Sequence, residues 1–201
     1  MSGSDLALVY LHGFNSSPSA RKAGLVGSYI GRQQIAADFF HPSIPDTPDE
    51  AVIFLENLMR RFSGRRVALI GSSLGGFYAT WLGEKYGLDV VLVNPAVRPH
   101  ELLCQYLGTN QNPYSGSYYQ LTEDHIATLQ SLFVSSLTRP EKRLVLLQTG
   151  DEVLDFQEAG RRFSASCCWI EHGGSHTFTG FERYLPAIFW WLAREHRIGR
   201  I

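Results

Sequence analysis

Cysteine is scarce in this chain of 201 residues, which contains only Cys104, Cys167 and Cys168. Three thiols cannot all pair, two of them are adjacent, and their spacing matches no metal-binding motif. This pattern argues against a disulfide-stabilised secreted protein. We therefore expect reduced thiols in a cytoplasmic protein, with neither a metal nor a cofactor.

Long apolar runs and an excess of one charge are also missing. No apolar run reaches the roughly 18 residues of a transmembrane helix, so no membrane span is predicted. Residues 1–5 lack the basic and apolar regions of a secretory signal, and we expect none. A net charge of −1 and a pI near 6.6 argue against a nucleic-acid partner.

Short apolar runs separated by turn-forming residues are abundant instead. They lie at 6–11, 34–40, 67–70, 90–93, 144–147 and 167–170. Continuous rather than alternating hydrophobicity is typical of strands buried on both faces of a parallel sheet. The length suits one domain that spans 1–201.

Helical patterns lie between these runs. A helix is predicted over 49–62, where an Asp follows a Pro, and another over 76–86. The last helix is expected to begin near Tyr184, with Pro186 in its first turn. Strands that alternate with helices predict an α/β fold, with a mostly parallel sheet of about six strands flanked by helices.

The stretch 98–140 interrupts this alternation, because a crossover between two strands needs far fewer residues. It is rich in Tyr, Gln, Asn, Ser and Gly. We interpret it as an inserted lid that is helical around 122–132.

A serine flanked by two glycines follows the third apolar run. Ser73 has Gly71 before it and Gly75 after it, whereas Ser72 lacks this spacing. In a sharp turn from a strand into a helix, the glycines allow close packing and the serine hydroxyl is exposed at the sheet edge. Ser73 is therefore the candidate nucleophile.

A serine nucleophile needs a general base and an acid that orients the base. In hydrolases with such a turn, the order along the chain is Ser, Asp or Glu, then His. Asp151 follows the run at 144–147, and His176 lies in a glycine-rich loop after the last run. Ser73, Asp151 and His176 form the candidate triad.

Other residues compete for the two supporting roles. Asp155 is better interpreted as the N-cap of a helix over 156–163, and Glu152 is a weaker candidate acid. His172 lies closer to its strand than His176 and is more constrained. The loop around His176 leaves this residue freer to reach the serine.

Preorganised N–H groups are needed to stabilise the oxyanion of the intermediate. The backbone amide of Leu74 is one candidate, because it follows the nucleophile. The second is the amide of Phe14, in the loop after the first apolar run. His12 is expected to hold this loop in place rather than to act in catalysis.

Several segments together resemble one known family. They are Leu11-His12-Gly13-Phe14, 71–76, Asn94-Pro95-Ala96, 149–155 and 173–176. Over nearly the whole chain they are similar to the YqiA family of small bacterial esterases of the α/β-hydrolase fold. The resemblance implies a cytoplasmic enzyme that hydrolyses acyl esters or thioesters with the same triad.

The expected partner is therefore a small-molecule ester or thioester, and the protein is expected to be a monomer or homodimer. Tyr114 in the insertion is a candidate substrate-binding residue. An anionic leaving group such as coenzyme A would need cations, and Arg98, Arg21 or Lys22 are candidates. Two alternative functions are a small peptidase and a ligand-binding module without catalysis.

Overall fold

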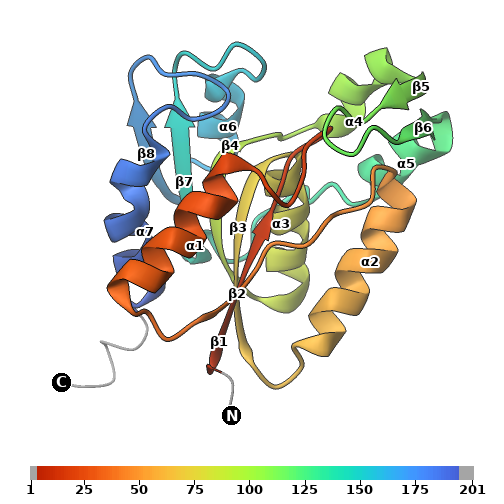
Figure 1. The fold of residues 1–201 in the computed structure, drawn as a ribbon. Coiled ribbons are helices and arrows are strands. Elements are labelled where there is room, and N and C mark those ends of the chain that lie inside the picture. Colours follow the sequence, from red (N-terminus) through yellow and green to blue (C-terminus); the bar gives the residue numbers. More distant parts are fainter. Residues whose placement is uncertain (1–3, 195–201) are drawn as a thin grey trace.

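A parallel sheet forms the centre of the computed structural model, which describes residues 4–194 (Figure 1). Within these residues the sheet has six strands in the order β2-β1-β3-β4-β7-β8, and every pairing is parallel. The strands are β1 (Leu6–Leu11), β2 (Asp38–Phe40), β3 (Arg66–Ser73), β4 (Asp89–Pro95), β7 (Arg143–Gln148) and β8 (Cys167–Glu171). The predicted parallel sheet of about six strands is confirmed.

Helices cover both faces of this sheet. The helices are α1 (Arg21–Gln33), α2 (Pro48–Arg61), α3 (Leu74–Tyr86), α6 (Phe156–Arg162) and α7 (Leu185–Leu192), the last preceded by the 3₁₀ turn η3 (Phe181–Tyr184). Buried residues of α1 and α7 pack in one cluster, and those of α2, α3 and α6 pack in another. The molecule therefore has three layers, with the sheet in the middle (Figure 1).

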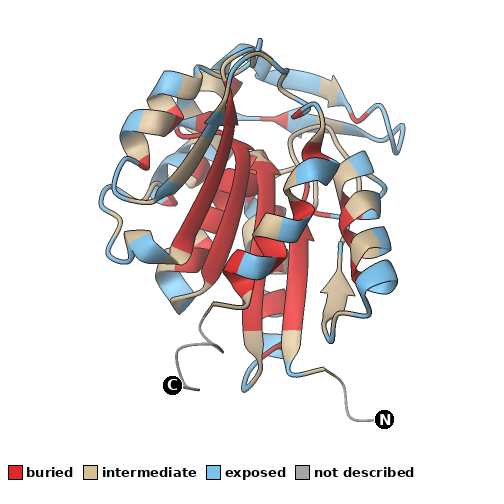
Figure 2. Ribbon diagram, turned by 90° about the vertical axis from the view of Figure 1, so that its left-hand side faces the viewer, coloured by how far each residue is buried: buried red, intermediate tan, exposed pale blue. Residues whose placement is uncertain are grey.

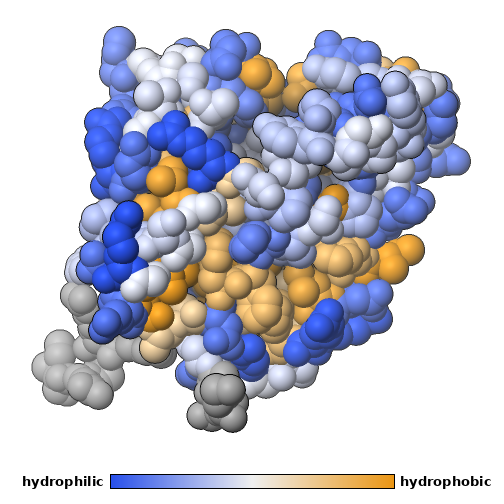
Figure 3. Space-filling model, in the orientation of Figure 1, coloured by the Kyte–Doolittle hydropathy of each residue, from blue (hydrophilic) through white to orange (hydrophobic). Residues whose placement is uncertain are grey.

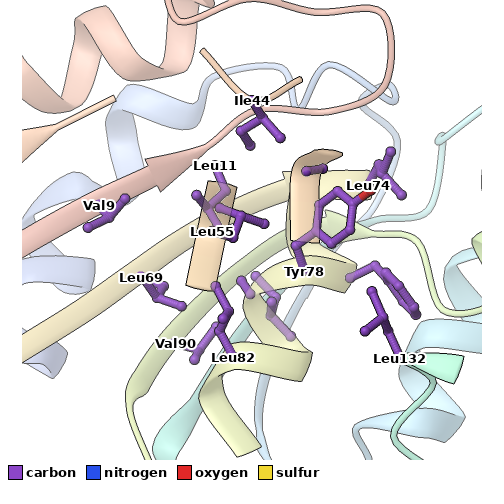
Figure 4. Packing of buried hydrophobic residues seen from close by; sticks show 14 of the residues in the cluster. Val9, Leu11, Ile44, Leu55, Leu69, Leu74, Tyr78, Leu82, Val90 and Leu132 are labelled. Atoms are coloured by element: carbon purple, nitrogen blue, oxygen red, sulfur yellow. The ribbon is translucent and has the colours of Figure 1, made fainter. Parts of the chain in front are cut away.

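The central strands are buried along almost their whole length (Figure 2). Successive side chains alternate between the two clusters, so that Leu69 and Ile70 of β3 lie on opposite faces. In the cluster on the side of α2, α3 and α6, Leu55 of α2 lies beside Leu11 of β1, and Leu82 of α3 lies beside Val90 of β4 (Figure 4). Burial on both faces explains why the strands are continuous apolar runs.

The insertion between β4 and β7 contains six short elements, which are α4 (Pro99–Leu102), η1 (Leu103–Tyr106), β5 (Gly108–Gln111), β6 (Tyr118–Leu121), α5 (Glu123–Ser131) and η2 (Pro140–Lys142). Strands β5 and β6 form an antiparallel hairpin. Asn112, between them, is buried and donates to Asp46 Oδ1 at 2.6 Å and to the Ser16 carbonyl at 3.2 Å. The insertion is thus joined to the loops that follow β1 and β2.

One edge of the sheet is formed by the short strand β2. Its Phe39 and Phe40 are half-buried, and Phe40 packs on Phe62 with ring centroids 4.7 Å apart. Hydrophobic residues gather between α1 and α2 on the face drawn in Figure 3.

Among residues 4–194, no helix has the length and apolar character that crossing a bilayer would require.

Candidate active site

Ser73 lies where β3 ends and α3 begins, in a strained backbone conformation. Its φ of 56° and ψ of −123° are rare for a residue with a side chain, and strain of this kind is concentrated at functional sites. The pairing of β3 with β4 shifts register between Ser72 and Ser73. The turn is held from the other side by the Ala96 amide, which donates to the Ser73 carbonyl at 3.1 Å.

The two glycines that flank Ser73 lie where backbones approach closely. A Cβ atom on Gly71 would lie 2.3 Å from the Gly75 carbonyl oxygen, and one on Gly75 would lie 2.1 Å from the Leu11 carbonyl oxygen. No side chain fits at these distances. The glycine spacing therefore allows α3 to pack directly against β1 and the end of β3.

The structure brings Ser73, His176 and Asp151 into one hydrogen-bonded chain. His176 Nε2 lies 3.1 Å from Ser73 Oγ, and His176 Nδ1 lies 2.9 Å from Asp151 Oδ2. A proton on Nδ1 is donated to the carboxylate, which leaves Nε2 to accept from the serine hydroxyl. The Asp151 side chain is only 2% exposed, and the amides of Val153 and Leu154 donate to its Oδ1, both at 2.9 Å.

The competing residues lie elsewhere or make other contacts. Asp155 caps α6 by accepting a hydrogen bond from the Gln157 amide at 2.8 Å, as predicted. Glu152 accepts from the His176 backbone amide at 2.8 Å, and this bond holds the pKa of its carboxyl below the usual value. His172 is exposed. Glu152 thus restrains the backbone of His176.

Two buried side-chain amides, to which the sequence alone assigned no role, support the loop of His176. Gln148, at the end of β7, accepts from the amides of Ser175 and Thr179 at 3.0 and 2.8 Å. Asn94, at the end of β4, donates to the Ser175 and His176 carbonyls at 3.0 and 3.2 Å. The side-chain oxygen Oδ1 of Asn94 also accepts from the Gln148 backbone amide at 3.0 Å. The imidazole is therefore positioned from two central strands.

Gln148→Leu is expected to loosen the loop 173–179 and to lower kcat about 10-fold or more. The substitution keeps the volume but removes the acceptor of the Ser175 and Thr179 amides, so their hydrogen exchange should accelerate about 10- to 100-fold. Hydrogen exchange and steady-state kinetics measure both effects. The matched control is Gln130→Leu on the exposed side of α5, which should change neither. Unchanged exchange at Ser175 and Thr179 would show that Gln148 does not support the loop.

The loop after β1 lies against the nucleophile. A Cβ atom on Gly13 would lie 3.0 Å from Ser73 Cβ, so the backbone of this loop is in close contact with Ser73. The ring of the next residue, Phe14, packs edge-on against Tyr106 and Tyr119 of the insertion, at centroid distances of 5.3 and 6.4 Å. Phe14 thus follows a residue whose backbone contacts Ser73, while its own ring packs against the insertion.

Leu74 is the first residue of α3, where backbone amides have no partner within the helix and the helix dipole favours negative charge. His12 holds the opposite loop, since its Nε2 accepts from the Ile44 amide and its Nδ1 donates to the Gly13 carbonyl, both at 3.0 Å. Burial lowers the pKa of His12, which disfavours the charged form of the ring. This arrangement fits the structural role that the sequence predicts for His12.

Comparison with known proteins identifies the family. Residues 7–193 match the model of the uncharacterised protein family UPF0227. The chain belongs to this family. The predicted resemblance to the YqiA family is thereby confirmed.

Solved structures with a similar fold are α/β hydrolases of low sequence identity. Est1E from Butyrivibrio proteoclasticus with bound ferulic acid is 10% identical, with a TM-score of 0.70 over 94% of this chain and 88% of that chain. A putative hydrolase from Agrobacterium vitis is 16% identical, with a TM-score of 0.69 over 95% and 90%. Mouse alpha/beta hydrolase domain-containing protein 10 is 14% identical, with a TM-score of 0.68 over 96% and 92%. The α/β-hydrolase fold of this UPF0227 member is confirmed.

A cavity of about 480 Å³ opens at Ser73 and His176. Its other lining residues include Phe14, Lys22 and Tyr114, the last of which is a candidate substrate-binding residue. The cavity is large enough for a small organic substrate.

In the described part of the chain, no cluster of three or more His, Cys, Asp or Glu side chains is arranged to hold a metal ion.

Arg98 is not among the residues that line this cavity. It lines a separate cavity of about 310 Å³, where its guanidinium binds Glu158 at 2.6 Å and Glu101 at 3.1 Å. Because two carboxylates already neutralise this cation, the structure gives no support to the expectation that Arg98 binds an anionic leaving group at Ser73. The sequence could not reveal this, since Glu158 is 60 positions away along the chain.

Proposed function

We propose that the chain is a serine esterase that hydrolyses acyl esters or thioesters through an acyl-enzyme on Ser73. The observation that carries this proposal is the chain of hydrogen bonds from Ser73 through His176 to Asp151. It is supported by the order in which the three residues follow one another in the sequence and by the strained turn at Ser73. A buried carboxylate, an imidazole and a half-buried hydroxyl that lines a cavity, in this order, suit general-base activation of the hydroxyl.

In the proposed reaction, Ser73 Oγ attacks the carbonyl carbon while His176 Nε2 accepts its proton. Asp151 stabilises the imidazolium that forms. The amides of Phe14 and Leu74 donate to the oxyanion, and His176 then protonates the leaving alcohol or thiol. Water attacks the acyl-enzyme in the same way, with His176 again as the base, and the acid is released with Ser73 restored.

Some structural neighbours are esterases or lipolytic enzymes by their own descriptions. They include an esterase domain from a Rhodothermus marinus protein and the metagenome-derived lipolytic enzymes LipS and LipT, while Est1E is described with ferulic acid bound. Their identities to this chain are only 10 to 14%, so the likeness is one of fold. The geometry at Ser73, rather than this likeness, supports ester hydrolysis.

The purified protein is expected to turn over p-nitrophenyl acetate and butyrate with a pre-steady-state burst of about one p-nitrophenol per chain when deacylation is slow. Butyryl-coenzyme A is assayed in parallel with a thiol reagent that detects the released coenzyme A, and this assay tests whether thioesters are also substrates. Release of p-nitrophenol no faster than in buffer, together with no hydrolysis of the thioester, would contradict the proposal. That result would favour a binding module without catalysis, whereas hydrolysis of peptide amides alone would favour a peptidase.

A further inference from the structure

A lysine lines the same cavity as the candidate nucleophile. Lys22 lies in the first turn of α1, and its Nζ donates to the Thr177 carbonyl at 2.9 Å. Thr177 directly follows His176, and Lys22, His176 and Ser73 all line the cavity of about 480 Å³. The ammonium group is therefore fixed next to the loop that carries the proposed general base.

The charge of Lys22 lacks a matching carboxylate. Within residues 4–194, no carboxylate lies within ion-pair distance of its Nζ, whereas its neighbour Arg21 pairs with Glu182 at 3.8 Å. Asp151 acts on Lys22 from a distance, but its carboxylate is already bound by His176. Lys22 is half-buried at the edge of this cavity, so its ammonium group is only partly hydrated, and a cation there without a carboxylate partner offers a place for an anion.

The protonation of Lys22 is compatible with this role. Burial is the main cause that lowers its pKa to about 8, the charge of Arg21 adds to this effect, and Asp151 opposes it. At pH 7 most molecules therefore still carry the ammonium charge. Only one of its three donors is used by the Thr177 carbonyl, which leaves the others for a ligand.

We propose that Lys22 binds an anionic group of the substrate, so that the preferred substrates are small esters that carry a carboxylate or phosphate near the scissile bond. This inference rests on the proposed esterase function and specifies its substrate class. A hydrogen bond between the ammonium group and a carboxylate or phosphate is charge-assisted on both sides, which makes such an anion a strong ligand for the donors that Thr177 does not use.

The experiment compares anionic esters with neutral esters of the same shape. In the first pair, monomethyl glutarate carries a carboxylate in its acyl part, and methyl isoheptanoate is its neutral counterpart. In the second pair, carboxyethyl butyrate carries the carboxylate in its alcohol part, and isopentyl butyrate is its neutral counterpart. For at least one pair, wild-type kcat/KM is expected to be about 10-fold or more higher for the anion. Lys22→Gln should lower kcat/KM for that anion about 10- to 100-fold and for its neutral partner less than about threefold.

Two further variants separate charge from structure. Lys22→Arg should keep most of the preference for the anion, because it keeps the charge. Arg32→Gln removes a positive charge from the exposed last turn of the same helix and should leave the preference unchanged.

Two outcomes would overturn the inference while leaving the esterase function intact. One is hydrolysis of neutral and anionic esters at equal rates by the wild type. The other is an equal loss of both activities in Lys22→Gln, which would make Lys22 a positioning residue for the loop 173–179. If the wild type hydrolyses none of the four esters, the proposed function itself fails and this inference fails with it.

Discussion

Ser73→Ala is expected to lower kcat for p-nitrophenyl butyrate by at least about three orders of magnitude without lowering the melting temperature. The substitution removes the only atom that could form the acyl-enzyme, and the remaining activity would come from the oxyanion donors and from binding alone. The backbone strain at position 73 is the same for alanine as for serine, so the fold should not change. Steady-state kinetics and thermal unfolding measure the two effects.

The matched control for this prediction is Ser72→Ala. Ser72 is the adjacent buried serine and hydrogen-bonds with Tyr10 rather than with His176. Its removal should lower kcat less than about 10-fold. If Ser72→Ala abolished activity and Ser73→Ala did not, the nucleophile would be wrongly assigned.

Gly75→Ala is expected to destabilise the protein by about 3 kcal/mol or more and to abolish activity. The new Cβ atom would lie 2.1 Å from the Leu11 carbonyl oxygen and 2.5 Å from that of His12. These atoms belong to the backbone of β1 and its loop, so α3 would have to move away from the sheet. Helix propensity alone predicts the opposite sign, since alanine is favoured over glycine within a helix by up to about 1 kcal/mol.

Gly24→Ala is the matched control, because Gly24 is also a helical glycine. No atom lies within 4 Å of a Cβ built on Gly24, and the residue is exposed on α1. This variant should be stabilised by up to about 1 kcal/mol. Denaturant unfolding measures both variants, and an equal change in the two would contradict the close contact inferred at Gly75.

The strands and the serine turn could be predicted because burial on both faces leaves a continuous apolar run. The structure lengthens the last four runs, and β3 continues to Ser73 itself. The run at 6–11 keeps its bounds, whereas the run predicted at 34–40 is a strand only over Asp38–Phe40. The helix α1 was not identified, since its sequence contains Gly24, Gly27 and Gly31, which weaken a helical signal. It forms because Ala23, Val26 and Ile30 pack against the sheet, and such packing is not visible in local propensity.

The insertion was predictable only in part. The expected helix near 122–132 forms as α5, whereas the β5–β6 hairpin is mostly exposed and gives no apolar pattern. The contact between Asn112 and Asp46 joins positions that are 66 residues apart, so only the fold reveals it. Whether the insertion acts as a lid stays a prediction.

The candidate triad could be predicted because each member follows a different parallel strand, and parallel strands end at the same edge of the sheet. The residues that support the triad or line the cavity beside it could not be predicted from the sequence. Gln148 and Asn94 look like ordinary polar residues at strand ends, and their roles depend on contacts with the loop 173–179. The sequence offers Arg98, Arg21 and Lys22 as candidate cations, and only the structure shows that Arg98 and Arg21 are already paired with carboxylates.

Labelling with a fluorophosphonate probe tests the central claim most directly, because such probes react with serine hydroxyls that a neighbouring base activates. Intact-protein and peptide mass spectrometry should show one adduct per chain, located on Ser73. His176→Ala should slow the labelling at least about 100-fold, and Ser73→Ala should abolish it. An adduct on another residue, or none on the folded wild-type protein, would contradict the account.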